Sequence, residues 1–310
     1  MTTPPLLTIG TRTSPLALAQ TGEATARLAA ADPALAAPDA FMISKIQTTG
    51  DQIQGRHLAE FGGKGLFAKE LDTALLDGHI DLAVHSLKDL ETRLPAGITL
   101  AACLEREDPR DTLIGVGLKG LDDLPKGALV GTASLRRQAQ LLHRRPDIQI
   151  TLLRGNIQTR MRKIREGEAD ATFLALAGLN RLGVGHEAAC ILSPEELLPA
   201  CGQGVIGITC RTDDSRVRAW LERINHAETM SQVFAERAML DQLDGTCRTP
   251  IGGLAAFGED GKLTLRGLVA RPDGSALFRG KLAGAGDDAH ALGRELGARL
   301  RRDAGDNLFQ

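Results

Sequence analysis

The chain has 310 residues, of which 43% are hydrophobic and 25% are charged, and its formal net charge at pH 7 is -2. This composition excludes a disordered chain, and the nearly balanced charge argues against a surface coated with basic residues for nucleic acid. No apolar run of about 18 residues occurs, so no transmembrane helix and no membrane partner are expected. At roughly 100–200 residues per domain, the length predicts two or three domains.

Cysteines and histidines indicate neither a disulfide framework nor a metal site. There are five cysteines, an odd number, and no two of them are spaced as Cys-x-x-Cys. The seven histidines are scattered without the spacing of zinc ligands, so no metal is expected. The opening residues lack the pattern of a secretory signal, which predicts thiols in a reducing cytoplasm. Aromatic residues make up only 3% of the chain, which argues against stacking on nucleic acid bases.

The first two thirds of the chain alternate short apolar runs with amphipathic stretches, beginning with an expected strand at 6–10 and a helix at 14–31. The next expected elements are strand 41–47, a turn at 48–51, helix 64–77 and strand 81–84. The alternation repeats with strands 128–131, 148–153, 171–175 and 205–210, and with helices 134–145, 157–166 and 213–225. Such alternation is typical of parallel βαβ units, so we predict an α/β fold for this part.

From about residue 226 the order of the expected elements changes. A helix at 228–243 precedes three expected strands, and a helix at 287–302 follows them. The strands are expected at 251–257, 262–269 and 276–282. This order predicts a smaller α+β module with a three-stranded antiparallel sheet.

Two segments share one arrangement, in which a strand is followed by Gly-Thr, a serine and a helix. Ser14 begins the helix expected at 14–31, with Arg12 two residues before it. Ser134 begins the helix expected at 134–145, with Arg136 and Arg137 in its first turn. A serine hydroxyl caps a helix N-terminus, whose free N–H groups and positive dipole end bind anions. The segments are therefore either two ordinary helix caps or two anion sites on two α/β lobes, which would hold carboxylates or phosphates from both sides.

Basic residues are concentrated between residues 131 and 165. This window holds nine basic residues and one acidic residue, Asp147, which gives a local charge of +8. Such segregation predicts a polyanionic partner, and the planar forks of arginine suit carboxylates and phosphates. We expect arginines at strand–helix junctions to bind ligand and basic residues on helix faces to be solvated. The former are Arg136, Arg137, Arg154 and Arg160, and the latter are Arg144, Arg145, Arg162 and Lys163.

Two further segments are candidates for chemistry. Lys88 and Asp89 follow the buried strand at 81–84, and α/β sheets place ligands at the carboxyl ends of strands. Asp89 is either a carboxylate that takes a proton or stabilises a cation, or half of a surface ion pair with Lys88. Cys247 lies in a short polar loop beside Arg248, where a thiol can become a nucleophilic thiolate. It is either a covalent attachment point or an incidental cysteine.

Two glycine-rich segments favour loops over nucleotide sites. The segment at 62–67 lacks the spacing of a phosphate-binding loop and is interpreted as a mobile loop that becomes a helix. The segment Gly202-Gln203-Gly204 is either a hinge between domains or a tight turn.

The order and spacing of these motifs resemble the porphobilinogen deaminase family, also called the hydroxymethylbilane synthases, over essentially the whole chain. The chain departs from the commonest family pattern at Glu60, Ala133 and Thr246, which bear on loop binding and cofactor position. The matching motifs are Thr11-Arg-Thr-Ser-Pro-Leu-Ala-Leu-Ala-Gln20, Gly62-Gly-Lys-Gly-Leu-Phe67, His85-Ser-Leu-Lys-Asp89, Glu107-Asp-Pro-Arg-Asp111, Gly131-Thr-Ala-Ser-Leu-Arg-Arg-Gln138, Leu153-Arg-Gly-Asn156, Gly202-Gln-Gly204 and the Cys247 loop.

The resemblance implies three domains. Two would be α/β lobes like those of periplasmic binding proteins, at 1–104 with 205–222 and at 105–204, and the third, at 223–310, would carry the cofactor. It also implies a monomeric, cytoplasmic transferase of heme and porphyrin biosynthesis whose substrate is porphobilinogen. A dipyrromethane cofactor, built from two porphobilinogen units, would be held by a thioether to Cys247. Four further units would be added head to tail to give hydroxymethylbilane, each with loss of one ammonia.

The resemblance further implies roles for single residues. Asp89 would be the catalytic residue, facing the pyrrole N–H and stabilising the cation left when ammonia departs, and Lys64 and Phe67 would lie on the mobile loop. The residues implied in cofactor binding are Asp89, Lys88, Ser134, Arg136 and Arg137. The residues implied in substrate binding are Arg12, Ser14, Arg154, Arg160 and Arg181.

The alternative function is that of a non-catalytic intracellular anion-binding protein of the same two-lobed architecture, which would not need Cys247.

Overall fold

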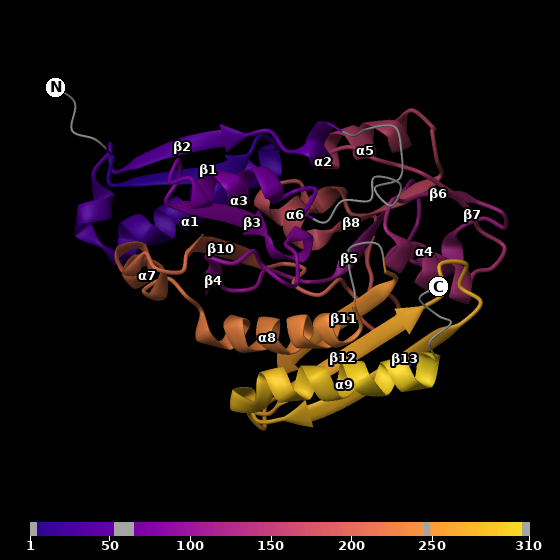
Figure 1. Cartoon of the computed structure of the whole chain (residues 1–310). Helices are drawn as coiled ribbons and strands as arrows, with labels where there is room; N and C mark the ends of the chain where they lie inside the picture. The colour runs from indigo at the N-terminus through magenta and orange to yellow at the C-terminus, as the bar shows by residue number, and fades with distance from the viewer. Residues whose placement is uncertain (1–4, 53–64, 245–248, 306–310) are drawn as a thin grey trace. The chain divides into compact units, whose positions relative to one another are not determined.

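The computed structural model (Figure 1) describes residues 5–52, 65–244 and 249–305. The chain divides into two compact units. Unit 1 holds residues 5–52, 65–107 and 205–230, and unit 2 holds residues 108–204 with the described residues from 231 onward. The chain therefore leaves unit 1 after Glu107 and returns to it after Gly204. The division into three domains at the boundaries expected from the sequence stays a prediction.

Unit 1 is built on a five-stranded sheet with the order β2-β1-β3-β10-β4. Strand β1 is parallel to β2 and β3, whereas β10 is antiparallel to both of its neighbours. Apolar residues of the sheet pack against α1 and α7, and a smaller cluster lies beside α3. The strands are β1 (Leu7–Arg12), β2 (Phe41–Ile46), β3 (Leu82–Ser86), β4 (Ile98–Cys103) and β10 (Ile206–Arg211). The helices are α1 (Pro15–Ala31), η1 (Pro33–Ala36), α2 (Thr49–Gln52), α3 (Lys69–Leu76), η3 (Leu87–Asp89) and α7 (Ser215–Glu222).

The first sheet of unit 2 repeats this plan with the order β7-β6-β8-β5-β9. Strand β6 is parallel to β7 and β8, and β5 is antiparallel to β8 and β9. In both sheets a strand that leads into a serine-capped helix stands second, and an antiparallel strand stands fourth. The strands are β5 (Asp111–Ile114), β6 (Leu129–Gly131), β7 (Gln149–Thr151), β8 (Ala171–Ala175) and β9 (Cys190–Ile191). The helices are η4 (Leu121–Asp123), α4 (Leu135–Arg144), α5 (Ile157–Arg165), α6 (Leu176–Arg181) and η5 (Gly185–Glu187).

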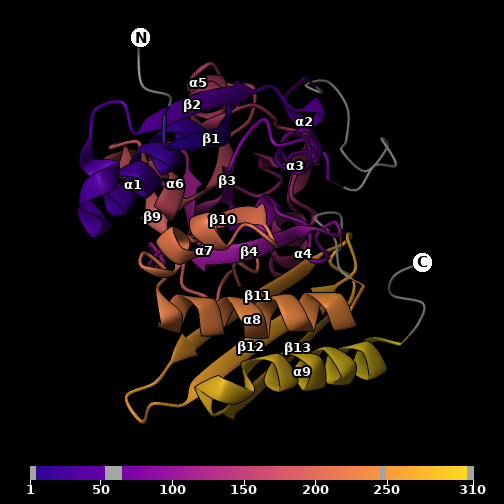
Figure 2. The same cartoon turned by 60° about the vertical axis from the view of Figure 1, so that its left-hand side comes forward.

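The second sheet of unit 2 is the expected antiparallel one, with the order β11-β12-β13. Two long helices, α8 and α9, lie side by side over it (Figure 2). They approach closely because α9 has a glycine where the helices meet: a Cβ atom on Gly293 would lie 2.1 Å from the carbonyl oxygen of Ala235 in α8. The elements are α8 (Ala227–Gln242), β11 (Ile251–Phe257), β12 (Leu263–Ala270), β13 (Leu277–Gly284), η6 (Gly286–Asp288) and α9 (Ala289–Ala304).

Strand β12 is buried on both faces at its carboxyl end. Since neighbouring residues of a strand point to opposite sides of the sheet, they contact different cores there. Val269 belongs to the core shared with α8 and α9. Leu268 and Ala270 belong to a second cluster with Ala139 of α4. The antiparallel sheet therefore supports α4, the arginine-bearing helix of unit 2.

The fold class is the predicted one, but the structure corrects several elements. Both large sheets are mixed rather than parallel, because β10 and β5 run antiparallel to their neighbours. The sequence did not predict strands β4, β5 and β9. The expected turn at 48–51 overlaps the single helical turn α2, and the helix expected at 64–77 begins only at Lys69. Among the described residues, no helix has the length and apolar character needed to cross a bilayer.

Candidate functional site

The candidate site of unit 1 lies at one edge of its sheet. Strands β1 and β3 are parallel, so their carboxyl ends meet at this edge. Arg12 ends β1, and Lys88 and Asp89 form the single turn η3 directly after β3. The start of β10 reaches the same edge, because the Leu87 N–H donates to the carbonyl of Val205 at 3.0 Å. Four of the residues singled out from the sequence, Arg12, Ser14, Lys88 and Asp89, thus lie in one unit at strand ends.

Ser14 is the predicted helix cap. Its Oγ accepts a hydrogen bond from the Ala17 N–H at 3.2 Å, and Pro15 occupies the first helical position, where its missing N–H costs nothing. This confirms the cap. The N-terminus of α1 therefore points its remaining N–H groups and positive dipole end toward the edge that holds Arg12.

Arg12 is paired with a carboxylate that sequence reasoning did not connect to it. Its Nε donates to Oδ2 of Asp51 at 3.2 Å, and its Nη2 donates to the other carboxylate oxygen. The guanidinium also lies 4.4 Å from the centroid of the Phe67 ring, a cation–π contact. Partial burial raises the pKa of Asp51, but the hydrogen bonds and charge of Arg12 outweigh it and hold that pKa below its usual value. Asp51 is therefore ionised.

Among the residues that the structure describes, Asp89 differs from Asp51 in that no arginine is paired with its carboxylate. It is half-buried at the end of η3. Within the described part of the chain, its side chain makes no hydrogen bond or ion pair that would occupy its oxygens. The alternative interpretation, an ion pair between Lys88 and Asp89, is thus not observed among these residues. A half-buried carboxylate with unoccupied oxygens can accept an N–H hydrogen bond or a proton from a ligand.

The corresponding edge of unit 2 holds the second predicted cap. Ser134 Oγ accepts the Arg137 N–H at 3.4 Å, which confirms the cap of α4. Strands β6 and β8 are parallel, and β5 runs the opposite way, so β5 begins where β8 ends: Asp111 is opposite Ala175. An acidic residue at the start of β5 is thus brought to the edge at which α4 begins.

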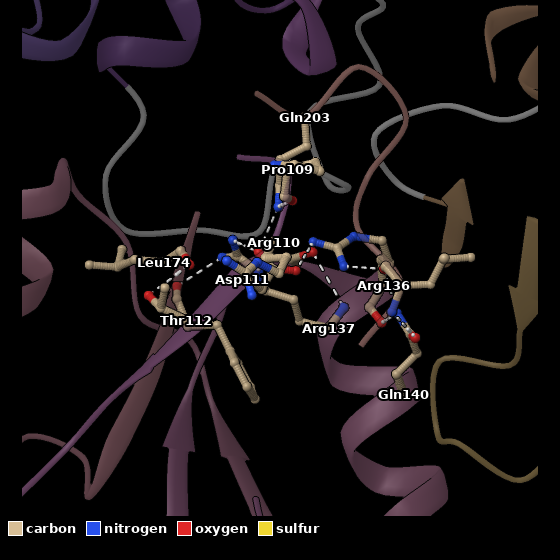
Figure 3. A network of polar contacts seen from close by, with 12 residues as sticks. Pro109, Arg110, Asp111, Thr112, Arg136, Arg137, Gln140, Leu174 and Gln203 are labelled. Atoms are coloured by element: carbon tan, nitrogen blue, oxygen red, sulfur yellow. Dashed lines mark hydrogen bonds and ion pairs between the residues drawn. The ribbon is translucent and has the colours of Figure 1, made fainter. Parts of the chain in front are cut away.

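Asp111 joins the two arginines of α4 in a buried ion cluster (Figure 3). Its Oδ2 lies 2.8 Å from Nη2 of Arg136, and its Oδ1 accepts from Nη2 of Arg137 at 2.7 Å. The side chains of Asp111, Arg136 and Arg137 are 0%, 5% and 7% exposed. Burial alone would raise the pKa of Asp111, but the two adjacent guanidinium groups lower it far below its usual value. The cluster carries a net charge of one positive unit.

The glycine-rich turn before β10 is hydrogen-bonded to this cluster. Gln203 Nε2 donates to Asp111 Oδ1 at 2.9 Å and to the carbonyl of Pro109 at 2.7 Å (Figure 3). Gly202 and Gly204 both have positive φ angles, +73° and +89°, which favour glycine. The segment is the tight turn, and its use as a hinge stays a prediction. Asp111 and Gln203 were missed as partners, although Asp111 lies in one of the motifs that carry the family resemblance.

The high charge of the window 131–165 is mostly compensated by acidic residues from elsewhere in the chain. The +8 count along this window therefore overstates the charge in the folded protein, because it omits acids that lie outside the window and pair with its basic residues. Arg145 was also expected to be solvated, yet it is 17% exposed and donates to the carbonyls of Leu121 and Leu124. The pairs are Arg136 and Arg137 with Asp111, Arg144 with Asp122, Arg145 with Asp147, Arg162 with Glu166, Lys163 with Glu168 and Arg165 with Glu187.

Three other predicted arginines, Arg154, Arg160 and Arg181, are half-buried in unit 2. Arg154 lies in the segment that joins β7 to α5, and burial lowers the pKa of its guanidinium. Arg181 Nη2 donates to the carbonyl of Gly204 at 3.1 Å. Lys64 and Cys247 lie outside the described residues, so their expected roles stay predictions, as does the mobility of the loop that includes Phe67.

Comparisons with known proteins show the family of this chain. A family model named "Porphobilinogen deaminase, dipyromethane cofactor binding domain" matches residues 7–219, and one named "Porphobilinogen deaminase, C-terminal domain" matches residues 230–302. The porphobilinogen deaminase of Nitrobacter winogradskyi is 52% identical over 304 residues, which are 98% of this chain and 95% of the relative. The chloroplastic porphobilinogen deaminase of Oryza sativa is 48% identical over 306 residues, or 98% and 86% of the two chains. A solved nutrient binding protein from Burkholderia cenocepacia bound to methionine is 14% identical with a TM-score of 0.43, covering 70% of this chain and 90% of that one. The chain belongs to the porphobilinogen deaminase family.

Proposed function

We propose that this chain joins four porphobilinogen molecules head to tail into hydroxymethylbilane on a dipyrromethane primer that a thioether attaches to Cys247. The observation that carries the proposal is the match of the two family models across almost the whole chain, which includes Asp89 and Cys247. The non-catalytic alternative is not favoured, because the curated relatives that match over 98% of this chain are deaminases.

Each of the two sheet edges, taken by itself, carries side chains that suit carboxylates such as those of this primer. Each pyrrole ring derived from porphobilinogen carries an acetate and a propionate, so the primer has two carboxylates per ring. Arginine forks and capped helix N-termini bind carboxylates well. In unit 1 we assign this role to Arg12, Ser14 and Lys88. In unit 2 we assign it to Ser134, Arg154, Arg160 and Arg181, and to the N–H groups of Arg136 and Arg137 that Asp111 and backbone carbonyls leave over.

Asp111 limits what Arg136 and Arg137 can contribute. Arg137 donates from Nε and Nη2 to Asp111 and from Nη1 to the carbonyl of Phe173 at 2.8 Å. Arg136 donates from Nη1 to the carbonyl of Leu198 at 2.6 Å. A guanidinium has about five N–H groups in a fixed fork, so each arginine keeps donors for a ligand while its position is held by the protein.

We assign proton handling to Asp89. In each cycle the C–N bond of the aminomethyl group of porphobilinogen breaks, and ammonia leaves with the proton that the acceptor pyrrole loses. The freed methylene would form a C–C bond with the unsubstituted α-carbon of an acceptor pyrrole, and the primer, held at Cys247, would supply the first such pyrrole. The substrate ring is positively charged while this happens. A carboxylate that accepts the pyrrole N–H stabilises that charge and holds the proton at its oxygen.

Attachment to the protein adds an entropic advantage to these steps. Since the growing chain stays bound through Cys247, each later condensation is effectively intramolecular, which raises the local concentration of the acceptor ring. The proposed arginine contacts then hold the acidic side chains of that chain while Asp89 acts on the incoming unit.

Intact mass spectrometry tests the attachment. The purified wild-type protein should exceed the polypeptide mass by a unit of two pyrrole rings, and Cys247→Ser should lack it. An unmodified wild-type mass would contradict the proposal. The variants Cys103→Ser and Cys190→Ser are matched controls that should keep the adduct, because these thiols lie in strands outside the Cys247 loop.

Turnover tests the role of Asp89. Asp89→Asn keeps the side-chain shape but removes the negative charge, so it should keep the primer adduct and lose ammonia release by about 10²–10⁴-fold. Ammonia release within tenfold of wild type would remove Asp89 from the mechanism.

We also propose that the protein works as a monomer in the cytoplasm. The four described cysteines are present as thiols, which is typical of a reducing compartment. Sedimentation at micromolar concentration should give the mass of one chain, 32.9 kDa.

A further inference from the structure

The two sheet edges each hold an aspartate–arginine pair, and the pairs differ in burial. Arg137 and Asp111 are 7% and 0% exposed, whereas Arg12 and Asp51 are 21% and 17% exposed. Breaking a fully buried pair leaves a charge without water or partner, but a pair that touches water can exchange partners at small cost. The Arg12–Asp51 pair is therefore the exchangeable one.

Asp51 binds Arg12 in the way a ligand carboxylate would. Both carboxylate oxygens take part, one with Nε and the other with Nη2 of Arg12. This two-point geometry is how arginine commonly recognises a free carboxylate. The position of Asp51 is fixed by Thr48, whose Oγ1 donates to Oδ2 at 2.8 Å.

The contact belongs to a tightly built corner. The Gly50 N–H donates to the carbonyl of Leu66 at 2.7 Å, and a Cβ atom on Gly50 would lie 2.3 Å from the Phe67 ring. Only glycine lets α2 come this close to the ring that Arg12 also contacts at 4.4 Å. The corner thus places one carboxylate and one aromatic face on Arg12.

We infer that Asp51 is an internal competitor for Arg12, which an acetate or propionate of porphobilinogen or of the growing chain must displace. The inference rests on the proposed function, because it takes Arg12 as a binding residue for those carboxylates. Asp51 then sets the affinity of the unit 1 edge: apparent affinity equals intrinsic affinity multiplied by the fraction of molecules in which Arg12 is available.

The variant Asp51→Asn tests the inference, because the two possible roles of Asp51 predict opposite signs. An amide keeps the shape but loses the charge that competes, so KM for porphobilinogen should fall about 3- to 10-fold while kcat changes less than twofold. If Asp51 instead orients Arg12 for the substrate, KM should rise. An unchanged or raised KM would overturn the inference.

Two further variants isolate the contact. Glu70 accepts the Thr49 N–H at 2.9 Å, so Glu70→Gln removes a negative charge beside α2 without touching Arg12 and should leave KM unchanged. In an Arg12→Gln background, Asp51→Asn should no longer lower KM. A decrease that persists without Arg12 would show that Asp51 acts elsewhere.

A binding measurement separates this inference from the proposed function. Isothermal titration of porphobilinogen into Asp89→Asn, with and without Asp51→Asn, reports affinity in the absence of turnover. The added Asp51→Asn should lower Kd by the same 3- to 10-fold factor. A wild-type protein without adduct or ammonia release would contradict the proposed function, whereas an unchanged Kd in this pair of variants would contradict the role of Asp51 alone.

Discussion

Replacing Asp111 by asparagine should destabilise the protein far more than the same change at an exposed ion pair. Asparagine has the shape of aspartate but no charge, and its amide group would place a donor against the Nη2 of Arg136, now 2.8 Å from Oδ2. Two guanidinium groups that are 5% and 7% exposed would then lack a counter-ion.

The magnitude follows from this burial. Removing one partner of a buried ion pair typically costs about 3–5 kcal/mol, because the remaining charge is stranded. Asp122 offers a matched control, since it pairs with Arg144 on the same helix α4 but is itself 72% exposed. Asp122→Asn should cost about 0–1 kcal/mol. The pKa of Asp111 is lowered, so its contribution is complete above about pH 4 and is lost only as the pH falls below that value.

Urea titrations followed by far-UV circular dichroism give the free energies of unfolding. The fluorescence of Trp220, which lies in α7 of unit 1, provides a separate probe of that unit. Asp111→Asn should lower the free energy of unfolding in the dichroism signal by at least about 3 kcal/mol, and Asp122→Asn by no more than about 1 kcal/mol. Equal losses in the two variants would refute the reasoning.

Three other substitutions should alter stability with a definite sign. Burial, and secondly the charge of Glu91, raise the pKa of Asp72 to about 6. The folded protein therefore binds more protons than the unfolded chain between about pH 4 and 6, and it loses stability as the pH rises through that window. Asp72→Asn should remove this slope and gain about 1–3 kcal/mol near neutral pH in urea titrations, and an unchanged slope would contradict it. Gly22→Ala, in α1 with no atom within 4 Å of the new Cβ, should raise the free energy of unfolding by about 0.5–1 kcal/mol. Gly293→Ala should lower the free energy of unfolding by about 1–3 kcal/mol, because the new Cβ atom would clash with α8. An increase in the free energy of unfolding in both glycine variants would contradict the close packing of α8 on α9.

Local signals predicted most helices and strands because they depend on neighbours in sequence. The caps at Ser14 and Ser134 and the strand at 171–175 follow from serine placement and apolar runs, and the structure has them where they were expected. Strand direction could not be predicted in the same way. A parallel and an antiparallel strand have similar composition, and the antiparallel position of β10 depends on its pairing with β3, more than a hundred residues earlier in the chain.

The sequence predicted only part of the candidate site, for the same reason. Residue type and position after a strand identified Asp89 and the arginines as candidates, but not their partners. Asp51 and Asp111 lie 39 and 26 residues from the arginines they bind, Arg12 and Arg137, and no local pattern joins them. The charge of a sequence window is therefore a poor measure of the charge that a ligand meets.

These internal carboxylates also answer a problem that any arginine-rich site for a polyacid must solve. The chain has to fold before a ligand supplies counter-charges, and buried guanidinium groups without partners would oppose folding. Asp111 neutralises one charge of the buried cluster permanently, since it is 0% exposed and its displacement by a ligand would leave its own buried charge without a partner. Asp51 neutralises Arg12 at a position that water reaches, so a carboxylate of the growing chain can take its place. On this reasoning, one edge keeps its geometry whether or not the primer is present, and the other can change partners at each of the proposed additions.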